Sequence, residues 1–67
     1  MNVRFWAARR NQQLSQMQLA EKAGVDQSDI SRVERGWIPP STVQQRLAEA
    51  LGVSVEAIFQ TAQEIAP

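Results

Sequence analysis

The chain has 67 residues, with seven basic and seven acidic side chains and neither cysteine nor histidine. This length predicts one domain with one small core, because a domain of about 60 residues buries only ~60% of its unfolded surface. The missing cysteine and histidine exclude disulfides and thiolate chemistry, and they remove the commonest general base and metal ligands. We therefore expect a globular, non-enzymatic domain with no metal and no cofactor.

The first helix is predicted over residues 2–12, where apolar residues recur at helical spacing. A second helix starts after Ser15, an N-cap whose capping-box partner is Gln18, three residues further on. Gly24 ends this helix, because glycine adopts the left-handed conformation that stops a helix abruptly. One face of the first helix is predicted to carry Met1, Phe5 and Ala8.

The third helix is predicted over residues 27–35, between the N-cap Asp26 and Gly36 just beyond its C-terminal end. Its inward side carries Ile30 and Val33. The helix follows the second one after a very short turn, so the two helices must pack against each other.

A fourth and a fifth helix complete the predicted fold. Ser41 and Gln44 have capping-box spacing and are predicted to begin the fourth helix, which Gly52 ends. Ser54 is predicted to cap the fifth helix. Because no segment alternates convincingly like a strand, the predicted fold is all-α, a compact bundle of five helices. The apolar positions of these two helices are Val43, Leu47, Ala48, Leu51, Val55, Ile58 and Phe59.

The second and third helices together have the pattern of a helix-turn-helix over residues 15–36. The small Ala20 lets the two helix backbones approach closely, and Gly24 lets the third helix leave at a steep angle. A helix that stands out from the body in this way can enter the major groove of DNA.

This segment resembles the phage-repressor and Cro type of helix-turn-helix, the XRE-like family. The resemblance extends over about residues 5–59 and implies a single domain, residues 1–67, with the lambda-repressor-like five-helix fold. The matching positions within the motif and just after it are Ser15-Gln16, Leu19-Ala20, Gly24-Val25, Ser28, Ile30-Ser31, Glu34, Gly36 and Pro40. Those outside it are Arg9, Leu47-Ala48, Leu51-Gly52-Val53 and Ile58-Phe59.

The resemblance implies which side chains read DNA bases. In the family, exposed early positions of the motif's second helix contact base edges, and here these are Gln27 and Ser28, with Arg32 one turn further on. Their chemistry suits the task, because glutamine can pair bidentately with adenine, arginine with guanine, and serine with either kind of base edge. Asp29 departs from this pattern, since a carboxylate there could accept from cytosine or lie near phosphates at a cost.

Further residues are expected to contact the phosphate backbone. Gln16 lies in the first turn of the second helix, where the family uses the matching position for a phosphate contact. Trp37 follows the recognition helix, and its indole N–H can donate to a phosphate. Family likeness also suggests an internal ion pair between Arg9 and Glu34, so Arg9 has two alternative roles. The remaining phosphate candidates are Arg10 and Arg35.

The implied partner is duplex DNA with a palindromic operator, bound by a homodimer, because one small module covers only a few base pairs. The resemblance suggests a repressor or controller protein in transcription. Two alternatives remain open: an antitoxin or adaptor that docks on another protein through its fifth helix, and the DNA-binding fragment of a longer regulator. The candidate residues for a dimer or partner interface are Ile58, Phe59 and Ile65.

The charge distribution and the hydropathy bear on location and partner. Residues 1–40 contain six basic and four acidic side chains, whereas residues 41–67 contain one basic and three acidic ones. The zero net charge is therefore an average over unlike halves, and it predicts weak non-specific DNA binding with a shallow salt dependence. No apolar stretch approaches the ~18 residues of a membrane span, so we expect a cytoplasmic protein without membrane contact.

Overall fold

The computed structural model describes residues 1–59, which form five α-helices and no strand. In chain order these are α1 (Val3–Asn11), α2 (Gln16–Ala23), α3 (Gln27–Glu34), α4 (Ser41–Leu51) and α5 (Val55–Ile58). The all-α, five-helix prediction is confirmed for this part of the chain. Among the same residues, no helix has the length and apolar character needed to cross a bilayer.

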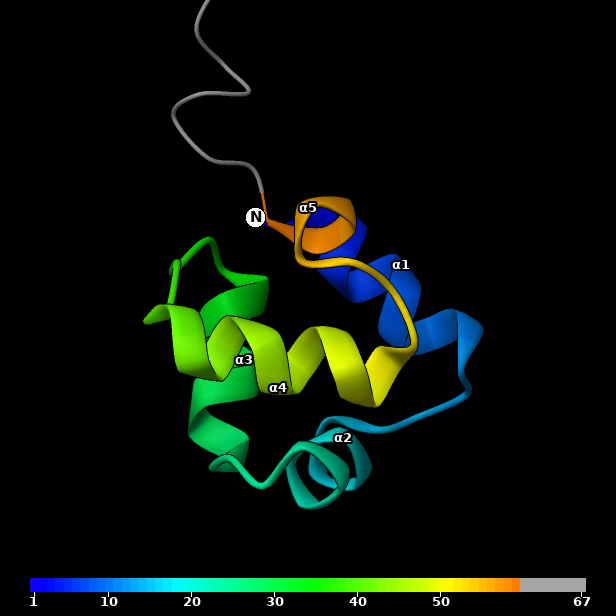
Figure 1. Cartoon of the computed structure of the whole chain (residues 1–67). Coiled ribbons are helices and arrows are strands. Elements are labelled where there is room, and N and C mark those ends of the chain that lie inside the picture. Colours follow the sequence, from blue (N-terminus) through cyan, green and yellow to red (C-terminus); the bar gives the residue numbers. More distant parts are fainter. Residues whose placement is uncertain (60–67) are drawn as a thin grey trace, which may run out of the picture.

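The five helices enclose one core. Helix α2 packs against α3 and α4, while α5 packs against α1 and α4 (Figure 1). Helix α1 also contacts α3, so α3 is held from two sides. The ring centroids of Phe5 and Phe59 lie 6.2 Å apart in the core and join α1 to the residue that follows α5. The other large buried side chains are Leu19, Ile30, Val33, Leu47, Leu51 and Ile58.

The start of α1 differs from the prediction. Asn2 is the N-cap, and its side chain accepts a hydrogen bond from the backbone N–H of Phe5. Its Nδ2 also donates to the carbonyl of Ile58 at 2.7 Å, and its backbone N–H donates to the carbonyl of Glu34 at 2.8 Å. Met1 was predicted to lie on one helix face with Phe5 and Ala8, but it precedes the helix and is 78% exposed, whereas Phe5 is fully buried. The prediction for Met1 is therefore wrong.

Two of the predicted N-terminal caps are confirmed. Ser15 and Gln18 form the complete capping box at the start of α2, with both reciprocal hydrogen bonds present. Ser54 caps α5 by accepting from the backbone N–H of Ala57 at 3.3 Å. Asp26 occupies the N-cap position of α3, although its side chain makes no capping hydrogen bond.

The capping box predicted at Ser41 is wrong. Pro40 is the N-cap of α4, and Ser41 is already the first residue of the helix. The side-chain amide of Gln44 instead donates to the carbonyl of Pro39 at 2.8 Å. The backbone of Pro40 is not helical, with φ −55° and ψ 156°, and α4 starts directly after it, so the N-cap lies one residue earlier than the serine signal indicated.

Helices α1 to α4 end in the same way, with a left-handed residue and a hydrogen bond that spans six residues. At α2 the left-handed residue is Gly24, and the N–H of Val25 donates to the carbonyl of Ala20 at 3.0 Å. At α1 the left-handed position is taken by Gln13, at φ 58°, which is the one non-glycine residue of positive φ in residues 1–59. No glycine occupies this position, so this helix ending carries no signal in the sequence.

Candidate nucleic-acid interface

Helix α3 has one side in the core and one side in solvent. Ile30 and Val33 are fully buried, whereas Gln27, Ser28 and Arg32 are exposed. Ser28 and Arg32 are four residues apart and therefore lie one helical turn from each other on the same side. We call the exposed side of α3 that carries Gln27, Ser28 and Arg32 its outer face.

The turn between α2 and α3 explains how α3 is presented. Gly24 has φ 72°, and an added Cβ at this position would meet no atom within 4 Å, so the left-handed backbone is what favours glycine here. Ala20 is buried between the helices, where a larger side chain would separate them. The two-helix unit predicted for residues 15–36 is therefore present.

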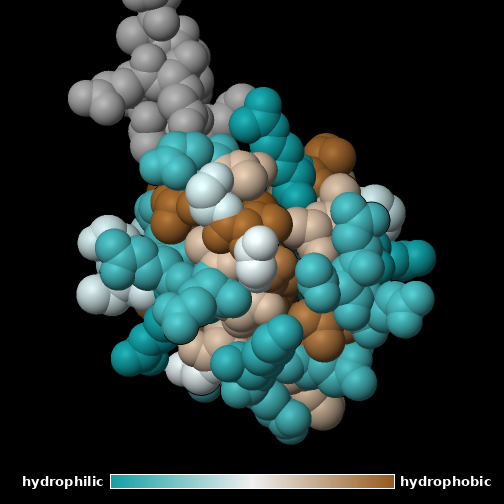
Figure 2. Space-filling model, turned by 45° about the vertical axis from the view of Figure 1, so that its right-hand side comes forward, coloured by the Kyte–Doolittle hydropathy of each residue, from teal (hydrophilic) through white to brown (hydrophobic). Residues whose placement is uncertain are grey.

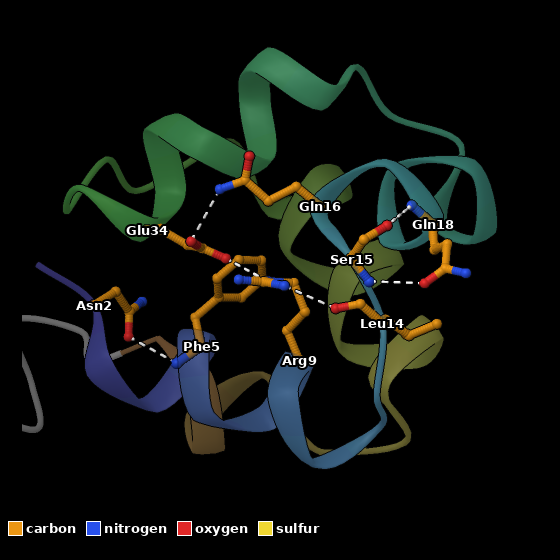
Figure 3. A network of polar contacts seen from close by, with 8 residues as sticks. All are labelled: Asn2, Phe5, Arg9, Leu14, Ser15, Gln16, Gln18 and Glu34. Atoms are coloured by element: carbon orange, nitrogen blue, oxygen red, sulfur yellow. Dashed lines mark hydrogen bonds and ion pairs between the residues drawn. The ribbon is translucent and has the colours of Figure 1, made fainter.

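A polar network ties α1, α2 and α3 together (Figure 3). The Nε of Arg9 donates to Oε2 of Glu34 at 2.6 Å, and its Nη1 donates to the carbonyl of Leu14 at 2.7 Å. The side-chain amide of Gln16 donates to Oε1 of Glu34 at 3.1 Å. Both carboxylate oxygens of Glu34 are thus engaged, each by a different helix. In residues 1–59 no buried side-chain nitrogen or oxygen lacks a hydrogen-bond partner.

The network contains the ion pair expected between Arg9 and Glu34. The Arg9 side chain is only 10% exposed, and two of its five N–H donors are engaged by Glu34 and Leu14. A phosphate contact of Arg9 stays a prediction. The side chain of Gln16 also keeps a donor, because an amide group has two N–H donors and the network uses one of them.

The other candidate phosphate contacts lie on the surface. Arg35 follows the end of α3 and is exposed. Arg10 is also exposed, and its guanidinium carbon lies 5.2 Å from the centre of the Trp6 ring. Trp6 thus packs against a neighbouring arginine one turn along α1, a contact that the sequence pattern did not indicate.

Arg32 has two neighbours that the sequence did not place beside it. Its Nη1 lies 3.9 Å from Oδ1 of Asp29, one turn earlier on α3. Its guanidinium carbon lies 4.3 Å from the centre of the Trp37 ring. For the proximity of Trp37, the signal available in the sequence was Gly36, because the helix ending that this glycine predicts brings residues 32 and 37 together.

The residues predicted for a dimer or partner interface need correction. Ile58 and Phe59 are each 1% exposed, because they fill the space between α5, α1 and α4. They cannot contact another protein in the folded chain. Ile65 lies outside the described residues. In residues 1–59 the large exposed apolar side chains include Met1, Val3 and Ile38. The face of the molecule in Figure 2 is covered mainly by hydrophilic groups, with apolar patches between them.

The five-helix core and the exposed second helix of the α2–α3 pair define a helix-turn-helix protein. Comparison with protein families agrees, since residues 4–58 match the helix-turn-helix domain family. The chain therefore belongs to this family.

Known relatives confirm the resemblance to phage repressors. The chain is 41% identical over 56 residues to the immunity repressor protein of Bacillus phage phi105. It is 42% identical over 55 residues to an uncharacterized HTH-type transcriptional regulator of Mycobacterium tuberculosis, found in strains CDC 1551 and H37Rv. These alignments cover 81–82% of this chain but only 39% of each relative. No solved structure matches the chain.

Proposed function

We propose that this protein binds duplex DNA sequence-specifically, with α3 in the major groove, and regulates transcription as a repressor or controller. The observation that carries the proposal is the outer face of α3, where Ser28 and Arg32 lie exposed one turn apart while the opposite side is anchored in the core. A helix whose polar side projects from a rigid body has the geometry of a major-groove reader.

The outer face has suitable chemistry for base recognition. Gln27 offers an amide that pairs with adenine, and Arg32 offers the guanidinium that most often reads guanine. Ser28 can donate to or accept from either kind of base edge. Each good bidentate pair contributes about 1–3 kcal/mol of discrimination against the wrong base, so two or three such contacts suffice for a specific half-site.

Phosphate contacts are assigned to groups beside this face. The second amide hydrogen of Gln16 and the exposed guanidinium of Arg35 are available for phosphates near the two ends of the α2–α3 unit. Arg10 is a further candidate on α1. Trp37 can donate its indole N–H to a phosphate, although its ring also contacts Arg32.

We further propose a homodimer on a palindromic operator, with half-sites about 34 Å or a multiple of it apart. One such module buries only about 600–1,000 Å² on DNA, which favours two copies for high affinity. The antitoxin or adaptor alternative loses its main support, because Ile58 and Phe59 lie in the core. The fragment alternative stays open, since the relatives are much longer than the region they share with this chain.

Selection from random duplex DNA tests the proposal. A purified sample of the chain should enrich one sequence, and a two-fold symmetric consensus would support the dimer. A short asymmetric consensus would support DNA reading but contradict the homodimer. If successive rounds enrich no sequence while the protein remains folded by circular dichroism, the proposed function is wrong.

A further inference from the structure

The end of α3 fixes Trp37 relative to Arg32 through the backbone. The N–H of Trp37 donates to the carbonyl of Arg32 at 3.0 Å, and the N–H of Gly36 donates to the carbonyl of Val33 at 3.0 Å. Gly36 supplies the positive φ, 116°, that this ending requires. Together these are the two hydrogen bonds of the Schellman motif. The indole therefore starts from a fixed position beside the last turn of α3.

The side chains of the same two residues meet on the surface. A Schellman motif is often accompanied by an apolar contact between these two positions. Here the contact is a cation–π pair, with the Arg32 guanidinium carbon 4.3 Å from the centre of the Trp37 ring. The Arg32 side chain is still 52% exposed, so the ring covers it only in part. A guanidinium on an aromatic face keeps its in-plane N–H donors for other partners.

Asp29 restrains the same guanidinium from within α3. Its Oδ1 lies 3.9 Å from Nη1 of Arg32, and its side chain is 27% exposed. At that distance it attracts the charge without forming a hydrogen bond, so it does not consume an N–H donor. Arg32 is therefore the residue of the outer face whose long side chain is held in place by two others.

We propose that Trp37 is a positioning residue that sets the base specificity of Arg32, by holding its guanidinium ready to pair with guanine. This inference rests on the proposed function, and it names the residue that makes base reading by Arg32 more selective. A free arginine loses much side-chain entropy when it binds a base, and a guanidinium that is already ordered loses less. The smaller loss of entropy increases affinity only for the base that Arg32 reads, and recognition at the other positions of the site is unaffected.

A phosphate contact by the indole N–H makes a different prediction. Phenylalanine keeps the aromatic face and loses the N–H, whereas leucine keeps apolar packing and loses the aromatic face. The informative variants are therefore Trp37→Phe and Trp37→Leu, each also combined with Arg32→Ala. Melting curves followed by circular dichroism establish that each variant is folded. Affinity is then measured for the duplex selected by the wild-type protein and for duplexes changed at one base pair.

We expect Trp37→Leu to reduce discrimination roughly two- to fivefold at the base pairs that Arg32→Ala affects, and at no others. Trp37→Phe should retain most of the discrimination. In the Arg32→Ala background, Trp37→Leu should cause no further loss of specificity. If Trp37→Phe and Trp37→Leu weaken all duplexes equally, the indole contacts a phosphate and the positioning role is wrong. Unchanged discrimination in Trp37→Leu would also overturn it.

A measurement without DNA separates this inference from the proposed function. The ring of Trp37 should shift the NMR signals of the Arg32 side chain, and the shift should persist in Trp37→Phe and vanish in Trp37→Leu. If the shift is present but the wild-type chain selects no DNA sequence, the pairing is real and the proposed function fails. If the wild-type chain selects a sequence but shows no such shift, the positioning role fails alone.

Discussion

Arg9 and Glu34, 25 positions apart in the sequence, are joined by an ion pair with 2.6 Å between Nε and Oε2. The two side chains are only 10% and 11% exposed, and Gln16 adds a third group to the same carboxylate. This pair links α1 to the end of α3. The orientation of the outer face relative to the rest of the molecule therefore depends on a contact outside that face.

Breaking this pair from one side should destabilise the fold. We expect Arg9→Met to lower the free energy of unfolding by about 3–5 kcal/mol, because it leaves the Glu34 carboxylate buried without its counter-charge. The double variant Arg9→Met, Glu34→Leu should recover most of the loss, since no charge remains buried. Urea unfolding measures both. A double variant as unstable as Arg9→Met would contradict this account of the pair.

The left-handed turns give a second prediction, with a matched control in the same chain. Gly24 and Gly52 have nearly equal φ values, 72° and 70°, and neither has an atom within 4 Å of an added Cβ. Alanine at either position should cost about 1–2 kcal/mol of unfolding free energy from backbone strain alone. Thermal unfolding that shows a much larger cost at Gly24 would reveal a packing constraint between α2 and α3 that the structure does not contain.

Gln13 offers a stabilising substitution. Its φ of 58° is strained for a residue with a Cβ, and glycine would relieve that strain. The relief of about 1–2 kcal/mol exceeds the added entropy of the unfolded chain, about 0.5–1 kcal/mol, so Gln13→Gly should stabilise the fold slightly. Gln13→Ala is the control, because alanine keeps the strain. Equal melting temperatures for the two variants would show that the turn is not strained.

The charge distribution predicts how DNA affinity responds to salt. With Arg10 and Arg35 as the charged phosphate contacts proposed above, log K against log salt should have a slope of roughly −2 per protomer, at ~0.9 for each phosphate neutralised. Arg35→Ala should make the slope shallower by about 1. Fluorescence anisotropy over a range of salt concentrations provides the slope. A value several times steeper would mean that many more cations reach the DNA.

Local signals in the sequence predicted much of the fold. Glycines 24, 36 and 52 marked helix ends, and Ser15 with Gln18 marked a helix start, because each signal acts within one turn of backbone. The same local logic failed at Ser41, where the preceding prolines determined the start of α4. It placed the end of α1 within one residue but contained no signal for the left-handed Gln13, which adopts a conformation that its residue type does not favour.

Long-range packing accounts for the remaining errors and omissions. An apolar stripe such as that of Ile58 and Phe59 looks the same whether it faces its own core or a partner, and here it faces α1 and α4. The exposure of the outer face followed from the family resemblance. The contact between Arg32 and Trp37 did not follow from the resemblance. Gly36 marks the helix ending that brings the two residues together, but whether their side chains meet depends on the side-chain conformations in the fold.

Sequence selection with matched variants measures whether the outer face of α3 reads DNA. Lys22 is the control, because it is an exposed basic residue that does not belong to the outer face. It lies on α2 in a shallow groove with Arg46 and Glu49 of α4. Wild type and Lys22→Ala should select the same consensus from random duplex DNA. Arg32→Ala should lose one or two base positions of that consensus, at about 1–3 kcal/mol each. If the Arg32→Ala protein selects the full wild-type consensus, the outer face of α3 does not read DNA through Arg32.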